Sequence, residues 1–82
     1  MPHVEVIWVD GRDGNVQHLA EHGVTPQECE DVLSDPIAQG TSDTTGRPIV
    51  FGFTRAGRKI AVVYEQVDAI TVYPITAFDV ED

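Results

Sequence analysis

The chain has 82 residues, of which 14 are acidic and 5 are lysine or arginine, so its formal net charge at pH 7 is -9. This charge repels polyanions such as RNA and DNA and attracts basic proteins. Hydrophobic residues make up 41% of the chain, which is enough for one small domain over residues 1–82, whereas no apolar run approaches the roughly 18 residues of a membrane helix. We therefore expect a single domain that binds neither nucleic acid nor a membrane.

The cysteine content and the N-terminus bear on the cellular compartment. Cys29 is the only cysteine of the sequence, so no internal disulfide can form, and its place on an apolar helical stripe suits a buried structural thiol. Residues 1–5 lack the basic segment followed by an apolar stretch that is typical of a secretory signal. We expect a cytoplasmic protein.

The first quarter of the chain predicts a strand and a short helix. Residues 4–9 are mostly β-branched or aromatic, which favours a strand that is buried on both faces. Residues 10–15 have the composition of a turn, and Asn15 at their end is suited to cap a helix. We expect this helix over residues 16–22, held by packing because an isolated helix of barely two turns is unstable in water.

The second helix has the clearest boundaries in the sequence. Gly23 suits the left-handed conformation that ends a helix. Thr25 and Glu28 form a capping-box pattern, with Pro26 at the first helical position, where a missing N–H costs nothing. The helix is expected to end at Asp35, since a following proline disfavours helical geometry. One apolar stripe follows from the helical spacing of Cys29, Val32 and Leu33.

The rest of the chain predicts strands. Residues 37–46 are rich in Thr, Ser, Asp and Gly and are interpreted as an exposed loop of undetermined role. Strands are expected over residues 48–53, 59–65 and 70–77. Residues 54–58 form a hairpin turn between the first two of these strands. Pro74 cannot donate to a sheet ladder, so the last strand should lie at an edge or contain a bulge.

The resulting order is β-α-α-β-β-β. Two helices on one face of a mainly antiparallel, four-stranded sheet would bury the helical stripes and one face of each strand. The predicted fold class is therefore a two-layer α+β domain.

Several short motifs, in this order, resemble the BrnT-type toxins of the RelE-like superfamily of ribonuclease toxins. The motifs cover nearly the whole chain: Trp8 with Asp10, His22-Gly23-Val24, Asp35-Pro36, Gly57-Arg58, Ala61-Val62-Val63-Tyr64 and Ile75-Thr76-Ala77. The resemblance implies a RelE-like fold and an antitoxin partner that binds DNA. It also implies RNA cleavage in which arginine and lysine side chains stabilise the charge that develops on the phosphate.

The sequence departs from the family where this chemistry would be located. In BrnT-like sequences the last strand continues into two arginines and a basic C-terminal helix, whereas here the arginine position is Phe78 and the tail is acidic. Basic residues remain at two family positions, Arg47 and Arg58. We therefore predict a RelE-like domain that lacks ribonuclease activity and acts through protein contacts. The alternative is an active mRNA-cleaving toxin that uses Arg47, Arg58 and perhaps Lys59 or a histidine such as His22.

Two histidines suggest further chemistry. His18 and His22 are four residues apart, so on a helix they share one face and could bind a metal ion or act as a general base. A pair without a third spaced ligand is more often two surface histidines, and His22 in the last helical turn also suits the helix dipole. A nucleophile and base formed by Cys29 and His22 is disfavoured by the apolar position of the thiol. We expect no metal and no cofactor.

Acidic residues gather on the outer side of the second helix and near the C-terminus. They are Glu28, Glu30, Asp31, Asp35, Asp79, Glu81 and Asp82. They form either a solvated surface or a docking site for a basic protein partner or antitoxin, whose binding would weaken at high salt. The edge of the last strand also allows a homodimer by strand pairing beside the monomer.

Overall fold

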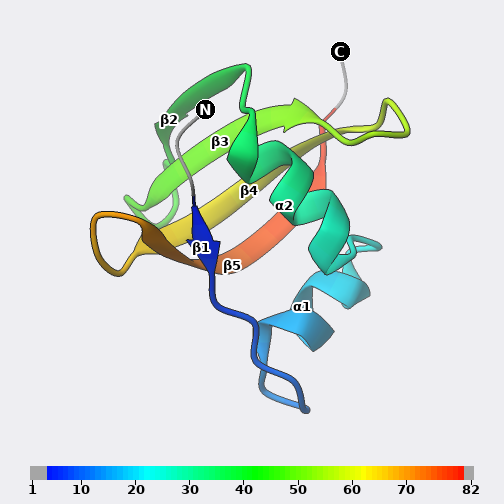
Figure 1. Ribbon diagram of the computed structural model, residues 1–82, viewed down its shortest axis with the longest axis vertical. Helices are drawn as coiled ribbons and strands as arrows, with labels where there is room; N and C mark the ends of the chain where they lie inside the picture. Colours follow the sequence, from blue (N-terminus) through cyan, green and yellow to red (C-terminus); the bar gives the residue numbers. More distant parts are fainter. Residues whose placement is uncertain (1–3, 81–82) are drawn as a thin grey trace.

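The computed structural model describes residues 4–80, in which a five-stranded sheet carries two helices on one face (Figure 1). The elements in chain order are β1 (Glu5–Val6), α1 (Asn15–Glu21), α2 (Pro26–Ser34), β2 (Ala38–Thr41), β3 (Pro48–Phe53), β4 (Lys59–Gln66) and β5 (Thr71–Asp79). The strand order is β1-β5-β4-β3-β2, with β1 parallel to β5 and the other neighbours antiparallel. No helix in this range is long and apolar enough to cross a membrane.

The α+β class is confirmed and the sheet is mainly antiparallel, but the predicted number of four strands is wrong, and the first strand differs from its predicted extent. The segment predicted as a loop over residues 37–46 contains β2, whose four residues are all exposed and pair with β3. The first strand is only two residues long, and it pairs in parallel with β5. An exposed strand has no apolar alternation, and a parallel partner distant in sequence leaves no local signal.

The capping box of α2 is confirmed. The hydroxyl of Thr25 accepts a hydrogen bond from the Glu28 N–H at 3.2 Å, and the Glu28 carboxylate accepts one from the Thr25 N–H at 3.0 Å. Gly23 has a φ of +74° and separates the two helices. Because these interactions are local in sequence, the sequence is sufficient to predict the start of α2.

Asn15 does not cap α1 as predicted. The N-cap is Gly14, and α1 begins at Asn15 itself. The buried Asn15 side chain instead accepts a hydrogen bond from the Val9 N–H at 2.8 Å and donates to the Ile7 carbonyl at 2.9 Å and the Pro74 carbonyl at 3.1 Å. It thereby joins the segment after β1 to the middle of β5.

Of the two alternatives predicted at Pro74, an edge or a bulge, the bulge is present, and β1 pairs with β5 only at Thr71 and Val72. β5 lies between β1 and β4. Its register with β4 shifts between Val63, which pairs with Thr76, and Tyr64, which pairs with Pro74. The outermost strands of the sheet are β1 and β2. A homodimer by strand pairing stays a prediction, and it would form most simply through one of these two strands.

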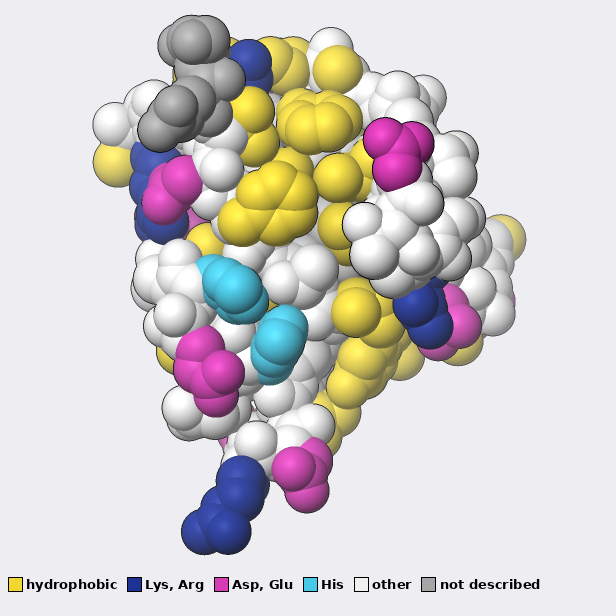
Figure 2. Space-filling view, turned by 180° about the vertical axis from the view of Figure 1, so that it is seen from behind, with side chains coloured by type: hydrophobic (Ala, Val, Ile, Leu, Met, Phe, Trp, Pro, Cys, Tyr) yellow, Lys and Arg dark blue, Asp and Glu magenta, His cyan; other side chains and the backbone are white. Residues whose placement is uncertain are grey.

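Apolar side chains pack on both faces of the sheet. The larger cluster lies between the helices and the sheet and includes Leu19 of α1, Val32 of α2 and Ile60 of β4. The smaller cluster lies on the face without helices and includes Ile49 and Val63. Figure 2 shows hydrophobic side chains gathered on this second face.

Candidate functional site

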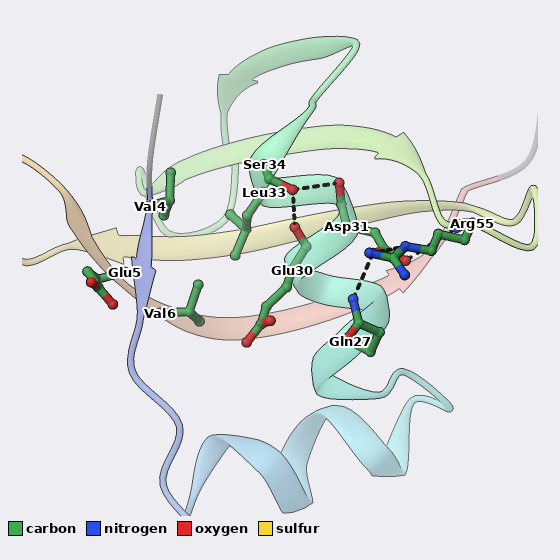
Figure 3. Close-up of a pocket in the computed structure, with 9 residues that line it drawn as sticks. All are labelled: Val4, Glu5, Val6, Gln27, Glu30, Asp31, Leu33, Ser34 and Arg55. Atoms are coloured by element: carbon green, nitrogen blue, oxygen red, sulfur yellow. Dashed lines mark hydrogen bonds and ion pairs between the residues drawn. The ribbon is translucent and has the colours of Figure 1, made fainter. Parts of the chain in front are cut away.

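A groove between β1 and α2 is lined by carboxylates. Its volume is about 350 Å³, and its walls include Val4 and Val6 on one side and Glu30, Asp31 and Ser34 of α2 on the other. In Figure 3 the Glu30 side chain extends from α2 toward Val6, on the side of the helix that faces β1.

The two carboxylates on the α2 wall have different partners within the chain. Glu30 accepts a hydrogen bond from the indole N–H of Trp8 at 2.6 Å, which fixes its orientation. Asp31 is 3.3 Å from the Nε of Arg55 and accepts a hydrogen bond from Gln27 at 2.9 Å. The Arg55 side chain is 84% exposed and that of Asp31 is 9% exposed. Asp31 also accepts a hydrogen bond from the backbone N–H of Arg55 at 3.3 Å, so this carboxylate is held by neighbouring groups on the wall of the groove.

The backbone of β1 adds hydrogen-bonding groups beside this groove. The N–H groups of Glu5 and Ile7 donate to carbonyls of Ile70 and Val72. Because successive residues of a strand point their backbone groups to opposite sides, the N–H and C=O of Val6 face away from β5. An extended segment could pair with Val6 at this edge and place alternate side chains near Glu30.

The groove continues into an apolar pocket of about 510 Å³. The two cavities share Val4, Leu33 and Ser34, and the second extends to Tyr64 and Ile70 near the turn between β4 and β5. The arrangement therefore combines an acidic end and an apolar end along the same side of α2.

Arg58 is enclosed by acidic groups. Its Nε and Nη2 donate to the two carboxylate oxygens of Asp79, and its Nη1 donates to Glu28 at 3.2 Å and to the Gly23 carbonyl at 2.7 Å. The hydrogen bonds to Asp79 raise the pKa of Arg58 and lower the pKa of Asp79. The guanidinium therefore links β4, β5 and α2.

The structure does not bring the predicted ribonuclease residues together. Arg47 precedes β3 and Arg58 precedes β4, and these strands are antiparallel with Phe53 paired to Lys59. The two arginines thus lie at opposite ends of β3, about 20 Å apart at 3.3 Å per residue. His22 lies near Arg58 in space, since it directly precedes Gly23, whose carbonyl accepts a hydrogen bond from Arg58.

Within residues 4–80, His18 and His22 contact each other and Cys29 is buried. The rings of His18 and His22 lie edge to face with centroids 5.2 Å apart, on exposed residues. Between residues 4 and 80, no group of three or more His, Cys, Asp or Glu side chains is placed to hold a metal ion. Burial raises the pKa of the Cys29 thiol to about 12, and the nearby charge of Glu30 acts in the same direction.

In comparisons with known proteins, no protein family, curated protein or solved structure is significantly similar to this chain. The sequence predicted that Glu30 and Asp31 face outward from α2, whereas both are half-buried along the groove, which the sequence missed together with the role of Trp8. The sequence offered one signal for this contact: the indole of Trp8 carries an N–H donor, and such a group usually finds a hydrogen-bond partner when the side chain is partly buried.

Proposed function

We propose that this chain is a RelE-like domain, related to BrnT-type toxins, that lacks ribonuclease activity and binds a basic, extended segment of a partner protein. The observation that carries this proposal is the groove between β1 and α2, which joins the carboxylates of Glu30 and Asp31 to an open strand edge. A segment with alternating basic and apolar side chains matches both features.

The charge distribution supports binding rather than RNA cleavage. An arginine that stabilises a phosphate must present its N–H groups to the ligand. The N–H groups of Arg58 are directed to Asp79, Glu28 and the Gly23 carbonyl, and Phe78 replaces the arginine of the family pattern. The net charge of -9 also opposes approach of RNA.

A growth assay with inducible expression, combined with analysis of total RNA from the same cells, tests the absence of catalysis. We expect normal growth and intact RNA. Growth arrest with RNA cleavage that Arg58→Ala abolishes would overturn the proposal and favour the toxin alternative.

Binding is tested with a fluorescent peptide of alternating lysine and valine, and a peptide of alternating glutamate and valine serves as the negative probe. The variant Glu30→Gln/Asp31→Asn keeps both hydrogen-bond acceptors but removes two charges from the groove. We expect it to weaken binding of the lysine peptide by about tenfold, and binding to decrease with salt. Asp10→Asn/Asp43→Asn removes the same charge from exposed positions outside the groove and its adjoining pocket. If both double variants weakened binding of the lysine peptide equally, net charge alone would explain the effect, and the assigned site would be contradicted.

A further inference from the structure

The sheet face without helices carries all three phenylalanines of the chain, Phe51, Phe53 and Phe78. Phe51 pairs with Ala61 and Ala61 pairs with Phe78, so these three side chains form a row across β3, β4 and β5. Phe53 is 47% exposed and Phe78 is 40% exposed. Clustered exposed aromatic side chains mark an interaction surface.

The strands contribute few charged residues to this face. Residues of paired strands that lie opposite each other share a face, which places Lys59, Ala61, Val63 and Glu65 of β4 on this side. Lys59 and Glu65 are the two charged residues that β2 to β5 contribute to it. Their charges are opposite, so the strands themselves add no net charge to this face.

We propose that a second copy of this chain covers the face, and that the two sheets pack face to face about a two-fold axis perpendicular to β4. The axis passes near the middle of β4, so β4 of one protomer crosses β4 of its partner in the antiparallel direction. Lys59 of each protomer then lies opposite Glu65 of the other, as a two-fold interface requires. This surface is on the opposite side of the sheet from α2, so the groove beside α2 stays accessible.

The charge order on β4 selects this arrangement over a second one. If the two-fold axis ran along β4, the strands would stack in parallel and Lys59 would lie opposite Lys59. The antiparallel stack replaces this like-charge contact by two opposite-charge contacts.

The size of the face limits the affinity. Four strands at about 4.8 Å spacing and six residues at about 3.3 Å per residue give roughly 380 Å² in projection per protomer. For two protomers this is roughly 760 Å², below the about 1,000 Å² of total area that stable specific interfaces exceed and in the range of weak, transient contacts. We therefore expect a dimer with a micromolar dissociation constant rather than an obligate one.

Sedimentation equilibrium over about 1 μM to about 1 mM protein tests the dimer. We expect the mass to rise from 9.0 kDa toward twice that value. Phe53→Ser and Phe78→Ser should each raise the dissociation constant at least about tenfold. Ile70→Ser is the control, because Ile70 is 52% exposed and lines the pocket beside Leu33 of α2, away from this face. A monomer throughout, or a dimer unaffected by both phenylalanine variants, would overturn the proposal.

A charge exchange tests the orientation. Lys59→Glu and Glu65→Lys each place like charges opposite one another in the antiparallel stack and should weaken dimerisation by about tenfold. The double variant Lys59→Glu/Glu65→Lys restores opposite charges and should return the dissociation constant to within about threefold of the original. Additive losses in the double variant would contradict the antiparallel arrangement. Circular dichroism of each variant verifies that the fold is kept.

Discussion

Asn15 is the buried polar side chain with the most distant partners in the described part of the chain. Three backbone groups, those of Val9, Ile7 and Pro74, depend on it. Buried backbone groups that lose their partner cost about 1 to 3 kcal/mol each. This accounts for an asparagine on the first turn of a helix whose N-terminus it does not cap.

We expect Asn15→Ala to lower the free energy of unfolding by about 2 to 4 kcal/mol, measured by urea denaturation. Gln17→Ala, at an exposed position of the same helix, should change it by less than about 0.5 kcal/mol. If both variants lowered the free energy of unfolding by the same small amount, water or local rearrangement would have replaced the Asn15 hydrogen bonds.

Cys29 should be unreactive in the folded protein. Its side chain is fully buried, and its pKa is raised to about 12 by burial. At pH 8 the thiolate fraction is therefore small and the sulfur is inaccessible to reagents. Ellman's reagent should react with the native protein at least about a hundredfold more slowly than with protein in urea. Fast labelling without denaturant would contradict the buried position.

At the scale of elements, Arg58 joins two strands to the second helix. It binds Asp79 of β5 and Glu28 of α2. We expect Arg58→Ala to lower the free energy of unfolding by about 1 to 2 kcal/mol in thermal or urea denaturation. Arg55→Ala removes the ion pair with Asp31, in which the arginine side chain is 84% exposed, and should lower the free energy of unfolding by less than about 0.5 kcal/mol. Equal effects would contradict a structural role for the Arg58 cluster.

The Arg58 cluster also predicts a pH dependence. The hydrogen bonds from Arg58 lower the pKa of Asp79 in the folded state. A lowered carboxyl pKa contributes stability above the unfolded value of about 3.9, and this contribution is lost as the pH falls through the folded value. The difference between the original protein and Arg58→Ala should therefore shrink from pH 5 to about pH 2. A difference that stays constant over this range would assign the effect to packing alone.

Elements with local signals could be predicted from the sequence, and elements with distant partners could not. The start of α2 depends on Thr25 and Glu28, three residues apart. β2 has no such signal, because its residues are exposed and only its ladder with β3 defines it. The same distinction applies to the site: the sequence placed Glu30 on the outer side of α2, but its bond to Trp8 spans 22 residues.

At the scale of the whole molecule, the net charge of -9 acts against the folded state through self-repulsion. Salt screens this repulsion, since the Debye length falls from about 30 Å at 0.01 M to about 10 Å at 0.1 M. Below the concentrations at which dimers form, the melting temperature should rise by a few degrees from about 0.01 M to about 0.3 M NaCl. Asp43→Lys reduces the net charge and should show a smaller rise. A melting temperature that falls with salt would indicate that attractive ion pairs dominate.

The parallel pairing of β1 with β5 has a consequence for the order in which the protein folds. Glu5 pairs with Thr71, so β1 cannot join the sheet until nearly all the intervening chain has been arranged. The hairpins of β3 with β4 and of β4 with β5 close much shorter loops and can form first. With only two residues in its ladder, β1 should also be the first strand to detach. The amides of Glu5 and Ile7 should then exchange with deuterium before those of β4, while the rest of the sheet remains folded.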